Sequence, residues 1–133
     1  MPKDILLIKG LAGKKTLKGT LPVYGAKNAA LPAFASTILF KDTVHLENVP
    51  SIEDITHMGE LLEDLGAEVA RKGAREWIIG AHKLNKTTLD RDLAKHMRAS
   101  IVLSGPILAR YGETSFPHPG GCVLGERPID MFL

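Results

Sequence analysis

Residues 25–40 have the sequence GAKNAALPAFASTILF, in which apolar side chains occupy nearly the whole circumference of a helix. A helix that is apolar on every side is buried on every side. Pro32 fits such a helix if it lies in or near the first turn, where its missing N–H group costs little. A second helix of this kind is predicted for residues 97–110. The sequence therefore predicts two helices in the interior of the fold.

Segments that alternate between polar and apolar residues surround these helices and predict strands with one exposed face. We also predict an amphipathic helix from Ile52 to Leu65, which Gly66 ends. Extended or strand segments are predicted at residues 5–9, 17–24, 44–49 and 113–116, and a β-hairpin is predicted from residues 68–71 and 76–79. Buried helices with half-exposed strands outside them invert the usual layering of an α/β fold.

Composition limits the possible functions. The chain has 133 residues, enough for one domain with a real core. Its apolar content of 44% argues against disorder, and its net charge of +2 is too small to indicate nucleic-acid binding. The single cysteine cannot form an internal disulfide, and no apolar run approaches the length of a membrane span. We therefore expect a soluble, cytoplasmic protein that binds neither nucleic acid nor membrane.

The single cysteine, Cys122, lies between glycines in the run PGGCVLG at residues 119–125. Glycines permit backbone conformations that other residues resist, so this loop can move. A thiol with an ordinary pKa of about 8.5 is mostly protonated at neutral pH and can donate a proton, while its thiolate is a nucleophile. The alternative is a small buried apolar residue, which is the usual role of a free cysteine. A metal site is not expected, because there is no second cysteine and the histidines are scattered, and no cofactor is predicted.

Three basic residues, Lys27, Arg98 and Arg127, lie at the starts of predicted helices. Free N–H groups and the helix dipole favour anions at such positions. Asn28 adds a donor and an acceptor beside Lys27. These residues predict sites for phosphate or carboxylate groups, and the alternative is that each is a solvated surface residue.

Several stretches together resemble the enolpyruvyl transferase family, in particular its members that act on UDP-N-acetylglucosamine. The main ones are GAKNAALP at residues 25–32, MRAS at 97–100, and PGGC and GERPID at 119–122 and 125–130. The stretches ENVP at 47–50 and LGAEV at 65–69 extend the resemblance along essentially the whole chain. The cysteine loop combined with the Lys-Asn motif is its most specific part.

The resemblance implies an α/β fold of two similar lobes, each an inside-out unit with buried helices and outward-facing mixed sheets. Residues 17–133 would form a partial, truncated first lobe that carries the catalytic cysteine loop. Residues 1–16 would be a strand and loop belonging to the second lobe. Family members are much longer, so the missing C-terminal portion of the same enzyme is an expected partner.

The resemblance also implies a reaction. The enolpyruvyl group of phosphoenolpyruvate would be transferred to the 3′-hydroxyl of UDP-N-acetylglucosamine by addition and elimination, with release of phosphate. Cys122 would be the proton donor, and phosphoenolpyruvate would be bound by Lys27, Asn28 and Arg127. The UDP-sugar would be bound by Arg98, Arg127, Pro128, Ile129, Asp130 and Met131. This is the first committed step of peptidoglycan synthesis and a fosfomycin target, and the chain alone is expected to be inactive.

Two alternatives remain open at this point. One is the related 3-phosphoshikimate 1-carboxyvinyltransferase of aromatic amino-acid synthesis, against which Cys122 argues because that relative needs no thiol in this loop. The other is a non-catalytic binding module that uses the exposed edges of a half-lobe. A substrate-competition assay and a native mass measurement, respectively, would distinguish them.

Overall fold

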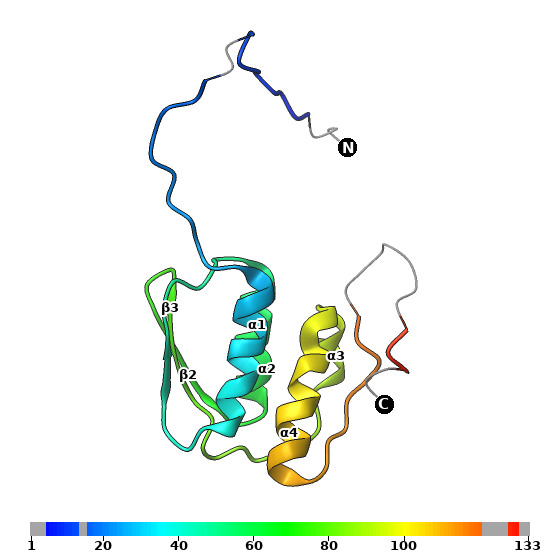
Figure 1. The fold of residues 1–133 in the computed structure, drawn as a ribbon. Coiled ribbons are helices and arrows are strands. Elements are labelled where there is room, and N and C mark those ends of the chain that lie inside the picture. The colour runs from blue at the N-terminus through cyan, green and yellow to red at the C-terminus, as the bar shows by residue number, and fades with distance from the viewer. Residues whose placement is uncertain (1–4, 14–15, 121–127, 131–133) are drawn as a thin grey trace.

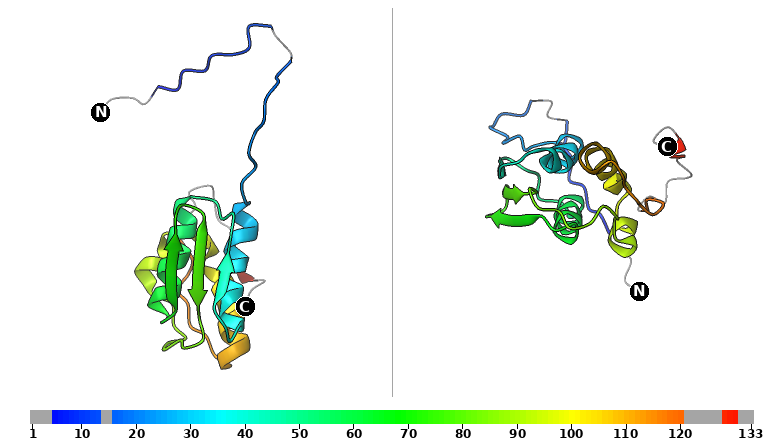
Figure 2. Two further views of the ribbon diagram at one scale, coloured as in Figure 1. Left: turned by 90° about the vertical axis from the view of Figure 1, so that its left-hand side faces the viewer. Right: turned by 90° about the horizontal axis from the view of Figure 1, so that it is seen from below.

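The structure is a computed structural model that describes residues 5–13, 16–120 and 128–130. One β-sheet lies on the outside, a pair of helices packs against it, and a second helical layer packs behind that pair (Figures 1 and 2). The sheet has the order β1-β3-β2 and comprises β1 (Val44–Leu46), β2 (Glu68–Lys72) and β3 (Glu76–Gly80). The helices are α1 (Lys27–Ser36), α2 (Glu53–Asp64), α3 (Arg91–Lys95) and α4 (Ser104–Tyr111), with 3₁₀ turns η1 (Thr37–Leu39) and η2 (Arg98–Leu103).

The predicted inside-out layering is confirmed at α1, whereas the second helix predicted for the interior is not buried on every side, since Leu108 of α4 is 52% exposed. Helix α1 lies between the sheet and the second helical layer (Figure 2), and its Phe34 is completely buried. The Phe34 ring meets Trp77 of β3 edge-on, with 5.2 Å between ring centroids. Helix α2 approaches the same indole through Gly59, where a Cβ atom would lie 2.9 Å from Trp77 Cζ3. One aromatic pair and one glycine therefore join both inner helices to the sheet.

The predicted hairpin of residues 68–71 and 76–79 forms as β2 and β3, within one residue at each end. All strand pairs in this sheet are antiparallel, so the predicted mixed pairing does not occur among these three strands. Val69, Ile79 and Val44 share the inner face by their register, while His45 and Ile78 pair on the outer face. The strand predicted at 113–116 is reduced to an isolated parallel bridge between Thr88 and Ser115.

The helix predicted for residues 97–110 is divided into η2 and α4. Pro106 explains the division, because it has no N–H to donate to the carbonyl of Val102 and its ring would clash with that group. The regular α-helix therefore begins at Ser104, which places Pro106 in its first turn. Gly112 then ends α4 in a left-handed conformation with φ of 78°.

The segments predicted as strands at residues 5–9 and 17–24 form no strand in the structure. Both extend away from the body of the fold (Figures 1 and 2), and their apolar side chains are exposed. A strand needs a neighbour to accept its backbone hydrogen bonds, and no described segment pairs with these residues. Their assignment to a second lobe remains a prediction.

Arg110 joins three separate parts of the fold. Its guanidinium donates hydrogen bonds to the carbonyls of Ile38, Ala81 and His82, at 2.5, 2.7 and 2.9 Å. The end of α4 is thereby tied to the end of η1 and to the residues that follow β3. None of the helices in the described ranges is long and apolar enough to cross a membrane.

Candidate functional site

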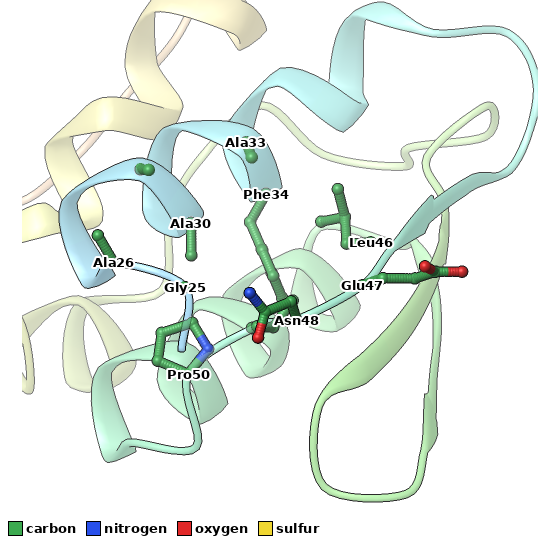
Figure 3. A pocket seen from close by; sticks show the side chains of 11 residues that line it. Gly25, Ala26, Ala30, Ala33, Phe34, Leu46, Glu47, Asn48 and Pro50 are labelled. Atoms are coloured by element: carbon green, nitrogen blue, oxygen red, sulfur yellow. The ribbon is translucent and has the colours of Figure 1, made fainter. Parts of the chain in front are cut away.

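Lys27 and Asn28 are the first two residues of α1, as the sequence predicts. The chain enters this helix through Gly25, whose N–H donates to the Asn48 carbonyl at 3.1 Å. A Cβ atom at Gly25 would overlap the Asn48 carbonyl oxygen, so only glycine permits this approach. The GAKN motif is therefore fixed against the loop that follows β1 (Figure 3).

Asn28 has a backbone carbonyl that lacks its usual helical donor, in addition to its exposed side chain. Pro32, four residues later in α1, has no N–H to donate to the Asn28 carbonyl. Pro32 is the sixth residue of α1, so it lies beyond the first turn in which proline costs least. The start of α1 thus combines an exposed amide side chain with a carbonyl that lacks its usual helical donor.

The ammonium of Lys27 is held by a carboxylate from the neighbouring helix. Lys27 Nζ lies 3.0 Å from Asp54 Oδ2, and the two side chains are 51% and 34% exposed. Asp54 lies in the first turn of α2, so α1 and α2 begin side by side at the same end of the fold (Figure 1). The sequence placed Asp54 in a helix start but gave no signal that this helix begins beside Lys27.

A shallow groove of about 190 Å³ runs beside this helix start, between α1 and the loop after β1 (Figure 3). Its walls are mostly small or apolar, and they are formed by Gly25, Ala26, Ala29, Ala30, Ala33, Phe34 and the stretch 46–50. The groove explains why the burial of α1 is incomplete, since Ala29 is exposed although Phe34 is not.

The structure describes the residues on either side of the candidate cysteine loop. Cys122, Arg127 and Met131 lie outside the described residues, as does the whole stretch 121–127. Gly120 packs so tightly on the Lys95 backbone that a Cβ atom there would overlap the Lys95 carbonyl.

Pro128, on the other side, accepts a hydrogen bond from the Arg98 guanidinium at 3.4 Å. Both flanks of the stretch 121–127 therefore meet the short segment 95–98, which joins α3 to η2. The structure thus brings Arg98 together with Pro128, two of the predicted site residues. Ile129 is buried, whereas Asp130 is exposed.

Helix α3, which carries Lys95, is fixed at its start by Asp90. The backbone N–H groups of Asp92 and Leu93 both donate to Asp90 Oδ1 at 2.9 Å. The hydrogen bond from Leu93 is the main cause that lowers the pKa of Asp90 below its ordinary value of 3.8. This side-chain cap gives the five-residue helix a defined start.

A cleft of about 450 Å³ separates α3 from residues 115–118 and adjoins the base of the cysteine loop. Arg91, Lys95 and His118 line it, with Leu89 and Phe116 among its apolar residues. Among the residues that the structure describes, no group of three or more metal-ligating side chains is clustered. The arrangement places the cationic side chains of Arg91 and Lys95 beside the base of the cysteine loop.

Residues 11–133 match the family model described as EPSP synthase (3-phosphoshikimate 1-carboxyvinyltransferase). The chain belongs to the EPSP synthase family. Named relatives are similar in sequence: a UDP-N-acetylglucosamine 1-carboxyvinyltransferase of Nitratiruptor sp. is 47% identical over 92% of this chain. Proteins with the same name from Cellvibrio japonicus and Magnetococcus marinus are 45% and 43% identical, over 92% and 98% of the chain.

The chain spans 29–30% of the length of these EPSP synthase family relatives. The fold agrees with the sequence: the crystal structure of the enolpyruvyl transferase NikO from Streptomyces tendae matches with a TM-score of 0.64. That match has 25% sequence identity and covers 72% of this chain and 22% of the NikO chain. The enolpyruvyl transferase fold predicted from the sequence is therefore confirmed.

Proposed function

We propose that the chain is the part of an enolpyruvyl transferase that supplies the proton donor and several anion-binding groups. The reaction transfers the enolpyruvyl group of phosphoenolpyruvate to the 3′-hydroxyl of UDP-N-acetylglucosamine and releases phosphate. The observation that carries the proposal is the identity of 43–47% with relatives of that enzyme name over nearly the whole chain. This activity belongs to peptidoglycan synthesis in the cytoplasm, and the rest of the family protein is the expected partner.

Cys122 acts as the general acid in this proposal. Protonation of the methylene carbon of phosphoenolpyruvate makes the adjacent carbon electrophilic, and the sugar hydroxyl then attacks that carbon. Proton transfer to carbon at neutral pH needs a positioned acid whose pKa is near neutrality. The meeting of both loop flanks with residues 95–98 supports this role, because it holds the loop base beside Arg98.

The basic residues bind the substrates in this proposal. Lys27, Asn28 and Arg127 surround phosphoenolpyruvate, whose phosphate and carboxylate need several donors and positive charges. Arg98 binds the UDP-sugar together with the stretch 127–131. The exposure of Lys27, Asn28 and Asp130 supports such contacts, because their polar groups are accessible from solvent.

Labelling by fosfomycin tests the proposal. The Cys122 thiolate opens the epoxide ring, which forms a C–S bond and breaks a C–O bond, and the resulting alkoxide takes a proton. We expect fosfomycin to label Cys122 of the 133-residue chain, and UDP-N-acetylglucosamine to change the rate. If iodoacetamide labels the thiol and fosfomycin does not, Cys122 is accessible but no preorganised anion site serves it, and the proposal is wrong.

Shikimate 3-phosphate distinguishes the second candidate, the 3-phosphoshikimate transferase. The description of the matching family model names that enzyme. We expect shikimate 3-phosphate to leave the labelling rate unchanged at concentrations where UDP-N-acetylglucosamine changes it. The reverse result would favour the second candidate.

A further inference from the structure

The starts of α1 and α2 form an unusual local environment around Lys27. Neither helix has a side-chain cap, since Ala26 and Ile52 occupy the two N-cap positions and make no side-chain hydrogen bond. Two uncapped helix starts place partial positive charge side by side. Asp54 lies at this point and pairs with Lys27 at 3.0 Å.

We propose that Asp54 is a positioning residue that holds the Lys27 ammonium where the anionic substrate is bound. This inference rests on the proposed function, in which Lys27 binds phosphoenolpyruvate. Asp54 itself touches no substrate in this account, so it acts only through Lys27.

The need for a positioning group follows from the flexibility of lysine. A lysine side chain has a four-carbon stem and loses much rotamer freedom when it is held in one place. Lys27 is half exposed, so packing alone does not select one position for its ammonium. The carboxylate of Asp54 gives the ammonium a preferred position before the substrate arrives, which lowers the entropy cost of binding.

The position of Asp54 is itself well fixed. The next residue, Ile55, is 1% exposed, and Met58 one turn later is completely buried. Helix α2 is thereby anchored in the core at the end that carries Asp54. Because the backbone that carries Asp54 is fixed relative to the core, its carboxylate can hold the flexible side chain of Lys27 in a defined position.

Two opposing effects of Asp54 must be separated. The carboxylate orients Lys27, which favours anion binding, but its negative charge also repels the anion. Glu53 provides a matched control, because it is an exposed carboxylate in the same first turn of α2. None of the described residues forms an ion pair with Glu53. Glu53→Gln removes a nearby negative charge without releasing Lys27, so it isolates the repulsion.

The experiment compares the rates at which fosfomycin and iodoacetamide label Cys122 in variants of the 133-residue chain. We expect Asp54→Asn to slow fosfomycin labelling by about threefold to fivefold, the range of a partly exposed ion pair, while iodoacetamide labelling is unchanged. Asp54→Glu should restore a rate close to the native one, because it keeps the charge on the same helix turn. Glu53→Gln should leave fosfomycin labelling unchanged or slightly faster.

The Lys27→Met background completes the test. There, Asp54→Asn should leave fosfomycin labelling unchanged or slightly faster, because the residue that Asp54 positions has been removed and only the repulsion by its charge remains. An equal effect in both backgrounds would overturn the positioning role, as would native-like labelling of Asp54→Asn in the Lys27 chain.

If fosfomycin does not label the native chain, the proposed function fails and this inference fails with it. Native labelling that Asp54→Asn leaves unchanged rejects the role of Asp54 alone. If Asp54→Asn folds poorly, Asp54→Glu provides the decisive comparison. Because Asp54→Glu keeps the negative charge, slower fosfomycin labelling of this variant would also contradict the proposal.

Discussion

Removing the guanidinium of Arg110 should destabilise the fold more than its position near the end of a helix suggests. Arg110→Met leaves the carbonyls of Ile38, Ala81 and His82 without their donor. A hydrogen bond to a charged group contributes about 1.5–3 kcal/mol, but these groups are only partly buried and water replaces some of the loss. We therefore expect a loss of about 2–4 kcal/mol in the free energy of unfolding, not the sum of three full bonds.

Urea denaturation measures this loss, with the fluorescence of Trp77 as the reporter, since it is the single tryptophan and is 7% exposed. Arg91→Met is the matched control, because it removes an exposed arginine from α3. Arg110→Lys should recover part of the stability, since one ammonium can replace some but not all of the bonds. The reasoning is refuted if Arg110→Met and Arg91→Met have the same stability within about 0.5 kcal/mol.

Three further outcomes follow from other parts of the molecule. Gly59→Ala should lower the free energy of unfolding by about 1–3 kcal/mol in urea denaturation, because the new methyl group would lie 2.9 Å from the Trp77 ring. This loss should occur although alanine favours a helix more than glycine does. A neutral or stabilising result would contradict this packing. Asp90→Ala should lower stability at neutral pH, because it removes the cap of α3. The folded pKa of Asp90 is lowered, so its contribution is present above the ordinary value of 3.8 and is lost as pH falls through the lowered pKa. Unfolding curves of the two proteins should therefore converge in acid, and a gap that persists there would contradict the cap. Finally, steady-state phosphate release from phosphoenolpyruvate and UDP-N-acetylglucosamine should be absent for this chain alone, and robust turnover would show that it needs no further part of the family protein.

Local patterns predicted the parts of the fold that depend on neighbouring residues. The β2–β3 hairpin formed as predicted because its turn and alternation are encoded within residues 68–80. Helix α2 followed its apolar stripe, and its bounds of Glu53–Asp64 lie one residue inside the predicted range at each end. The buried character of α1 was correct for Phe34 and Leu31 but not for the side that faces the groove.

Features that depend on distant segments could not be predicted from the sequence. Nothing local indicates that α1 and α2 begin side by side, so the Lys27–Asp54 pair was missed. The contacts of Gly120 with Lys95 and of Pro128 with Arg98 likewise join residues far apart in the chain. The site motif itself was identified by resemblance, and the roles of Cys122 and the other site residues remain predictions.

Protection of Cys122 by phosphoenolpyruvate is the most direct test of the central claim. That claim is that the Cys122 thiol and the basic residues act on the same phosphoenolpyruvate anion. The measurement is the rate of fosfomycin labelling of Cys122, by intact mass, at increasing phosphoenolpyruvate. The account predicts that the rate falls in a saturable way, while inorganic sulfate at equal ionic strength protects much less. An unchanged rate at saturating phosphoenolpyruvate, or equal protection by sulfate, would contradict a substrate site at Cys122.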